Sequence, residues 1–180
     1  MKEANKILKF INFIFFTVIG MFLFIDGFFI IIFSKDYLSS VMLFIILPLT
    51  YLISTALIKR YEFSLKETEM PLIIGLFISA IAFLSLIFIR SSAGLIFTQI
   101  TIGIGAGIYM PAYLILLKYH DGKTINKTKE LVTNLVITIA GMMLAGLLVL
   151  FLSLKLILLI MTSLYIFASV FTLLLPRKIL

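Results

Sequence analysis

The chain has 180 residues, of which 63% are hydrophobic and 13% are charged; its net charge is +7 and its mean hydropathy is +1.26. A water-soluble domain is about half apolar and a quarter charged, so this composition excludes a soluble fold. The absence of cysteine and the single histidine exclude disulfides, cysteine metal sites and a histidine-based catalytic cluster. We therefore expect an integral membrane protein that contacts the lipid bilayer and binds no nucleic acid, metal or other cofactor.

Six apolar runs follow one another along the chain, separated by polar breaks. Each run is close to the roughly 20 residues that a helix needs to cross a bilayer. Unpaired backbone groups are costly in hydrocarbon, so each run should be helical. The predicted spans are residues 10–33, 41–58, 71–89, 94–117, 131–152 and 156–175. The sequence thus predicts an all-α membrane domain over residues 10–180, preceded by a basic cytoplasmic segment at residues 1–9.

The basic residues predict how these spans are oriented. Twelve of the 15 Lys and Arg residues fall on one side of the membrane, and only Lys35, Arg90 and Lys155 fall on the other. Cytoplasmic loops carry an excess of Lys and Arg, so both termini should be cytoplasmic and the protein should lie in the plasma (inner) membrane. His120 falls in the longest basic loop, where we expect it to be solvated.

The fourth run carries the most specific pattern, ITIGIGAGIYMPAYLILLKYHDGKTINKTKE over residues 100–130. Glycines that weaken a soluble helix allow close helix packing in a bilayer. We therefore interpret Gly103, Gly105, Gly107 and Pro111 as a packing stripe first and a hinge second. The Gly-x-Gly-x-Gly-x-x-x-Pro-Ala pattern resembles the fourth transmembrane helix of major facilitator superfamily transporters. The resemblance implies one six-helix half of that fold, similar to the amino-terminal half and built as two inverted three-helix repeats.

The loop after the second run departs from the signature of that family, Gly-x-x-x-Asp-Arg-x-Gly-Arg-Arg. With Lys59 at the first basic position, Ser54 replaces the glycine and Ile58 replaces the aspartate. Lys59 and Arg60 would then belong to the cytoplasmic gating loop, without the acid that steadies one conformation. Gln99 stands where proton-coupled drug exporters of the family often have an arginine. These departures argue against ordinary gating and against that kind of proton-coupled antiport.

Asp26 is the only ionisable residue inside a predicted span, and such residues usually face a cavity. Asp26 and Gln99 should lie at similar depths, about 10 Å and 8 Å from the external surface by helical rise. In the resembling family both of their helices line the central cavity, so the two side chains could converge there; a water-exposed aspartate and a simple interhelical hydrogen bond are the alternatives. Tyr109 could line the inner mouth of the cavity or belong to an interfacial belt. Asn12 and Asn134 lie near the cytoplasmic ends of their helices, where a polar residue needs no special role.

The sequence favours a half-size secondary-transporter-like protein, which would move an unidentified small solute by alternating access. It would do so after pairing with a second copy of itself or with another six-helix half. The alternative is a non-transporting membrane subunit or a degenerate transporter remnant. We expect no enzyme, since the sequence has no paired acids, no His cluster and no Ser–His pair. It also lacks the Gly-x-x-x-x-Gly-Lys-Ser/Thr motif that ATP-driven transport would need.

Overall fold

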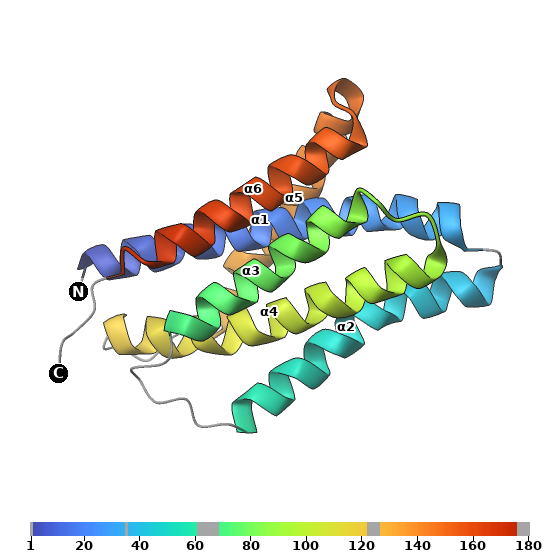
Figure 1. Cartoon of the computed structure of the whole chain (residues 1–180). Coiled ribbons are helices and arrows are strands. Elements are labelled where there is room, and N and C mark those ends of the chain that lie inside the picture. Colours follow the sequence, from blue (N-terminus) through green and yellow to red (C-terminus); the bar gives the residue numbers. More distant parts are fainter. Residues whose placement is uncertain (1, 35, 61–68, 122–126, 176–180) are drawn as a thin grey trace.

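The computed structural model describes residues 2–34, 36–60, 69–121 and 127–175, and all regular structure within them is helical (Figure 1). Each of the six helices is long and apolar enough to cross a membrane, which indicates a multi-pass membrane protein. The prediction of an all-α fold with six spans is confirmed. The helices are α1 (Lys2–Phe33), α2 (Tyr37–Arg60), α3 (Glu69–Leu86), α4 (Ser92–Asp121), α5 (Lys127–Phe151) and α6 (Leu154–Thr172).

Two helices extend well beyond the apolar runs from which they were predicted. α1 begins at Lys2, inside the predicted basic segment, and α4 continues to Asp121. A helix can continue beyond an apolar run as long as its side chains find packing partners. In the extra turns of α1, the side chains of Ala4 and Leu8 are completely buried. His120, expected in a solvated loop, lies in the last turn of α4 and is buried, so that prediction was wrong.

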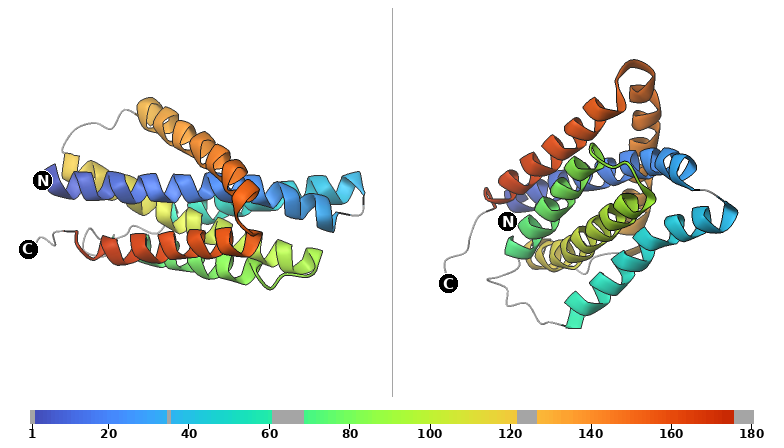
Figure 2. Two further views of the ribbon diagram at one scale, coloured as in Figure 1. Left: turned by 90° about the horizontal axis from the view of Figure 1, so that it is seen from above. Right: turned by 45° about the vertical axis from the view of Figure 1, so that its right-hand side comes forward.

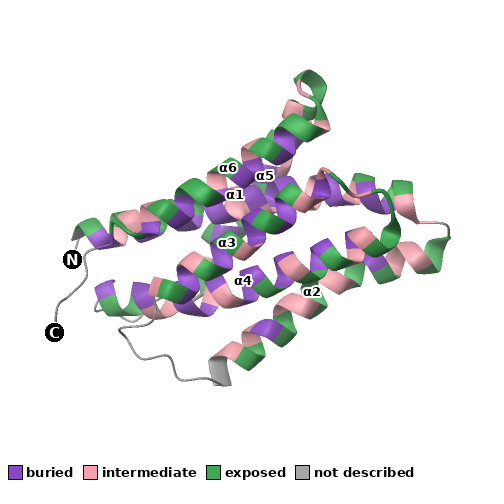
Figure 3. Ribbon diagram, in the orientation of Figure 1, coloured by how far each residue is buried: buried purple, intermediate pink, exposed green. Residues whose placement is uncertain are grey.

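The six helices form three layers of two (Figure 2). α1 and α4 make the middle layer, α3 and α6 cover one side of it, and α2 and α5 lie on the other. The start of α1 and the end of α6 lie at the same end of the bundle (Figure 1). More than half of the membrane-spanning stretch of α1 and of α4 is buried, against 11% for α2 and 17% for α5. Figure 3 shows the buried residues concentrated between the layers. The outer surfaces of α2 and α5 therefore need lipid or a partner to cover them.

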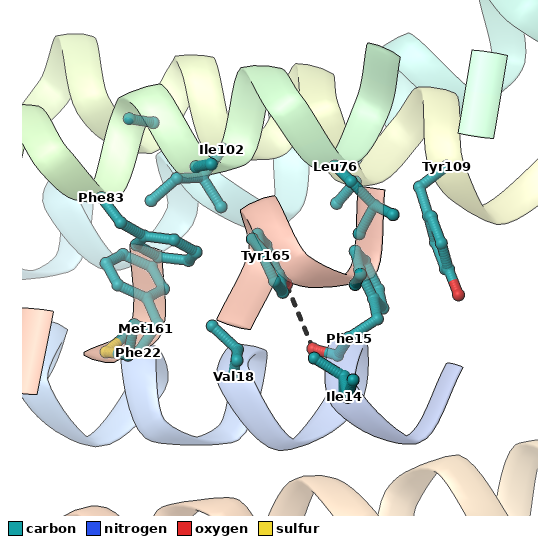
Figure 4. Close-up of a cluster of buried hydrophobic side chains, with 14 of the residues drawn as sticks. Ile14, Phe15, Val18, Phe22, Leu76, Phe83, Ile102, Tyr109, Met161 and Tyr165 are labelled. Atoms are coloured by element: carbon teal, nitrogen blue, oxygen red, sulfur yellow. Dashed lines mark hydrogen bonds between the residues drawn. The ribbon is translucent and has the colours of Figure 1, made fainter. Parts of the chain in front are cut away.

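An aromatic cluster fixes the layer of α3 and α6 on the middle layer (Figure 4). The ring of Phe15 stacks on that of Tyr109 with 3.9 Å between centroids and faces Tyr165 at 5.7 Å. The Tyr165 hydroxyl donates a hydrogen bond of 3.1 Å to the backbone carbonyl oxygen of Phe15. Phe83 of α3 lies between Tyr165 and Phe22, at centroid distances of 5.2 and 5.4 Å. A buried tyrosine usually needs such a partner for its hydroxyl, and here the bond joins α6 to α1.

The glycines of α4 lie at two close helix crossings. Gly103 and Gly107 face α2: a Cβ atom on Gly103 would lie 2.8 Å from the Cβ of Thr50, and one on Gly107 would lie 2.5 Å from the Cβ of Ser54. Gly105 faces the opposite way, where a Cβ atom would lie 2.7 Å from a backbone oxygen of α3. The stripe therefore packs α4 against two neighbours at once. A hinge at the glycines or at Pro111 stays a prediction.

A similar crossing joins α1 to α5. A Cβ atom on Gly20 would lie 3.1 Å from the Cα of Gly141, and one on Gly141 would collide with the carbonyl oxygen of Thr17. No pattern in the sequence singles out Gly20, because no other small residue stands four positions from it. Gly27, about two turns further along α1 from this crossing, has no atom within 4 Å of the position of its Cβ. The requirement for glycine thus belongs to the crossing and not to α1 in general.

Candidate functional site

A long hollow runs between α2 and α5, with α1 and α4 as its floor. It consists of two adjoining cavities of about 500 and 640 Å³, which share Phe16, Tyr51 and Met110 in their walls. Each volume falls within the range of small-molecule binding pockets. Asp26 lies in the wall of the first cavity, and Glu130 in the wall of the second.

The structure brings Asp26 of α1 and Gln99 of α4 into direct contact. The side-chain nitrogen Nε2 of Gln99 donates to both carboxylate oxygens of Asp26, at 2.9 Å each. Gln99 is fully buried and Asp26 is 5% exposed. The amide is the only hydrogen-bond partner of the carboxylate among the described residues, and the amide oxygen of Gln99 has none there. The pair therefore holds the Asp26 carboxylate in the cavity wall, and no described lining residue carries a positive charge to balance it.

Tyr109 lies behind the wall of the first cavity and is not among the described residues that line it. The side chain is fully buried, and its ring stacks on Phe15, which does line that cavity. Its hydroxyl lies 3.5 Å from the side-chain oxygen of Asn12, at the outer limit of a hydrogen bond. An interfacial belt tyrosine would instead present its hydroxyl to the headgroups.

A second polar cluster borders the other cavity. Asn12 of α1 donates from Nδ2 to Oδ1 of Asn134 of α5 at 2.8 Å, and both side chains are buried. The interpretation of these asparagines as interfacial residues without a role was therefore wrong. Nearby, the Tyr113 hydroxyl of α4 donates to Oε1 of Glu130 at 2.7 Å. Asn134 and Glu130 both line the second cavity. The similar predicted depth of the two asparagines was the signal that could have paired them.

The predicted gating residues, Lys59 and Arg60, are the last two residues of α2. Their side chains lie outside the described residues, as does the segment 61–68 that follows them. The gating role of this loop remains a prediction.

The groups that line the hollow can bind a ligand by charge and by apolar contact. The described residues contain no group of three or more His, Cys, Asp or Glu side chains that could hold a metal ion. What the hollow offers is one carboxylate near each end of an apolar and aromatic wall. The chain matches no family model, no curated protein and no solved structure. The likeness to the major facilitator superfamily therefore rests on the sequence pattern.

Proposed function

We propose that this protein is a half-size secondary-transporter-like membrane protein. It moves a small solute by alternating access, after a second six-helix half has covered the hollow between α2 and α5. The observation that carries the proposal is the Asp26–Gln99 pair, which places a buried carboxylate in the wall of a cavity on this side of the bundle. Ionisable residues within membrane spans are characteristic of substrate and ion pathways.

The way the helices pack supports the inverted-repeat architecture. α5 packs on α1 as α2 packs on α4, and α6 packs on α1 as α3 packs on α4. Exchanging the first three helices with the last three therefore maps these contacts onto one another. A unit of three spans reverses direction across the membrane, so two such units in one chain have opposite orientations. Transporters built from inverted repeats bind substrate near the bilayer midplane, at the interface between their repeats.

Close small-residue crossings occur at both equivalent positions of this arrangement. Gly20 and Gly141 form the one between α1 and α5, and Gly107 with Ser54 forms the one between α4 and α2. α2 and α5 form the two rims of the hollow. Each crossing packs one of these rim helices against a helix of the floor, α1 or α4. This correspondence supports the same exchange of units, although the residue types at the two crossings differ.

Cysteine crosslinking in native membranes tests the pairing, because the natural chain has no cysteine. Phe44→Cys on α2 and Leu135→Cys on α5 place thiols on the two rims, where the native side chains are 68% and 55% exposed. We expect rapid crosslinks through these positions, either to a second copy or to another six-helix chain. The matched control is Phe167→Cys on α6, which is 50% exposed on the opposite side of the bundle. Crosslinks formed only through α6, or a strict monomer in lipid, would contradict the proposal.

The alternative function is a non-transporting membrane subunit. It is favoured by the absence of the family's gating motif, with Ser54 and Ile58 in place of its glycine and aspartate. In the structure Ser54 is used for packing, because its Cβ faces Gly107. A subunit of this kind would show the rim crosslinks, but their rate would not change with any solute or with the membrane potential. A transporter would show such a change, since alternating access moves the two halves against each other.

A further inference from the structure

We propose that the hollow binds a lipophilic organic cation, with Asp26 as its counter-charge. This inference rests on the proposed function and names the substrate class of the same site. The first cavity has one charged side chain, Asp26, among its described lining residues. Its other walls are apolar or aromatic, including Phe15, Phe16, Phe44 and Met110. A ligand complementary to this surface is largely apolar and carries one positive charge.

The electrostatics of the pair select a cation over an anion or a neutral solute. The Asp26 carboxylate receives two hydrogen bonds from a single neutral amide group, so its charge is solvated but not neutralised. A buried charge without a counter-charge is costly, and supplying that counter-charge is a favourable contribution that only a cation makes. An anion would meet only repulsion here.

The aromatic walls favour the same ligand class. The faces of Phe and Tyr rings attract cations, and the rings of Phe16, Phe44 and Tyr51 line the first cavity. They also bury the apolar part of the ligand. The cavity volume of about 500 Å³ accommodates a compact molecule with several rings.

The opposite end of the hollow repeats the charge pattern. Glu130 is the only charged residue among the described lining of the second cavity. Asn12 donates a hydrogen bond to Asn134, which lies four residues after Glu130 on α5. Asn12 precedes Asp26 by 14 residues of α1. This corresponds to about 21 Å along the helix. The two acids are therefore well separated, and the path between them holds no described Lys, Arg or His side chain. A cation moving along it meets attraction at both ends and no positive charge between.

Equilibrium binding of radiolabelled tetraphenylphosphonium to the purified full chain in lipid nanodiscs tests this inference. Its charge is independent of pH, and tetraphenylborate offers nearly the same shape with the opposite charge. We expect saturable binding of the cation, no competition by the borate, and a loss of affinity of about thirtyfold or more in Asp26→Asn. Asp26→Glu, which restores the charge, should recover most of the affinity.

One control variant removes the same charge elsewhere. Asp36→Asn lies outside the hollow, just before α2, where the Asp36 carboxylate accepts a hydrogen bond from the backbone nitrogen of Ser39 at 2.7 Å. Hydrogen bonds from Ser39 hold the pKa of Asp36 below its usual value, so it is ionised at neutral pH, and asparagine can replace it as a cap. Asp36→Asn should change the affinity much less than Asp26→Asn.

The outcomes separate this inference from the proposed function. Wild-type affinity in a folded Asp26→Asn protein, equal effects of Asp26→Asn and Asp36→Asn, or competition by tetraphenylborate would overturn the cation inference. Rim crosslinks that respond to the membrane potential, without tetraphenylphosphonium binding, would support the transporter proposal and reject the lipophilic cation as its substrate class. Binding at Asp26 without any rim crosslink would support a cation-binding membrane protein and reject the proposed pairing of two six-helix halves.

Discussion

Substituting Gly107 by alanine should separate α2 from α4 and destabilise the bundle. A Cβ atom at Gly107 would lie 2.5 Å from the Cβ of Ser54, 3.1 Å from the backbone nitrogen of Thr55 and 3.2 Å from the backbone oxygen of Tyr51. None of these atoms is the end of a flexible side chain. Two carbons in contact sit about 3.5–4.0 Å apart, so the helices must move apart by about 1 Å.

The expected magnitude is the difference between two opposing effects. Overpacking of this kind costs about 1–3 kcal/mol. Alanine in place of glycine within a helix contributes about 0.5–1 kcal/mol in the other direction. Gly107→Ala should therefore lower the free energy of unfolding by about 0.5–2 kcal/mol, or the melting temperature by about 1–8 °C for a chain of this size. Gly107→Leu should do more and reduce the yield of folded protein.

Gly27→Ala is the matched control, because a Cβ atom there has no neighbour within 4 Å. Only the helix-propensity gain remains, so this variant should melt about 1–4 °C above the parent. The assay is thermal unfolding of the purified proteins in one detergent, followed by circular dichroism and by monodispersity on size exclusion. If Gly107→Ala rises in parallel with Gly27→Ala, then α2 does not pack on α4 at this crossing and the reasoning fails.

Two further predictions concern orientation and the second polar cluster. Lys123→Cys should be shielded from an impermeant thiol reagent outside intact cells, and Arg90→Cys should react; the reverse labelling would reject cytoplasmic termini. Asn12→Leu should lower the free energy of unfolding by about 1 kcal/mol, because it leaves the Asn134 side-chain oxygen without its donor. A double-mutant cycle with Asn134→Leu should give a coupling of about 0.6 kcal/mol, and a coupling of zero would show that the hydrogen bond does not stabilise the fold.

The spans were predictable because one physical requirement, an apolar helix long enough for the bilayer, decides them. The ends of α1 and α4 were not, because a helix can continue outside the membrane when its side chains still pack, as Ala4 and Leu8 do. The Asp26–Gln99 contact was anticipated as a shared depth on two helices expected to line one cavity. Depth follows from counting residues along a helix, whereas contact also needs the rotation of each helix about its axis, which counting does not give.

The same limit explains the two features that sequence reasoning missed. Asn12 and Asn134 were placed near the same membrane surface, but the contact between α1 and α5 that joins them involves residues far apart in the chain. Gly20 becomes recognisable only once α5 crosses it, because its role is defined by the approach of Gly141. Patterns within one helix identify its packing face when small residues repeat along it. A single small residue gives no such periodicity.

The carboxylate, more than the size of the hollow, supports the proposed functional role. Lipid tails are as apolar as Phe44, Leu47 and Met142, so they can fill an apolar hollow between α2 and α5 at little cost. Lipid tails cannot donate a hydrogen bond to Asp26 or balance its charge, and its two oxygens share a single amide donor among the described residues. A charged side chain at this depth costs several kcal/mol unless water, a partner or a counter-ion reaches it. Replacing Asp26 by asparagine should therefore raise the stability of the isolated protein while it weakens cation binding. That opposition distinguishes a residue kept for a ligand from one kept for the fold.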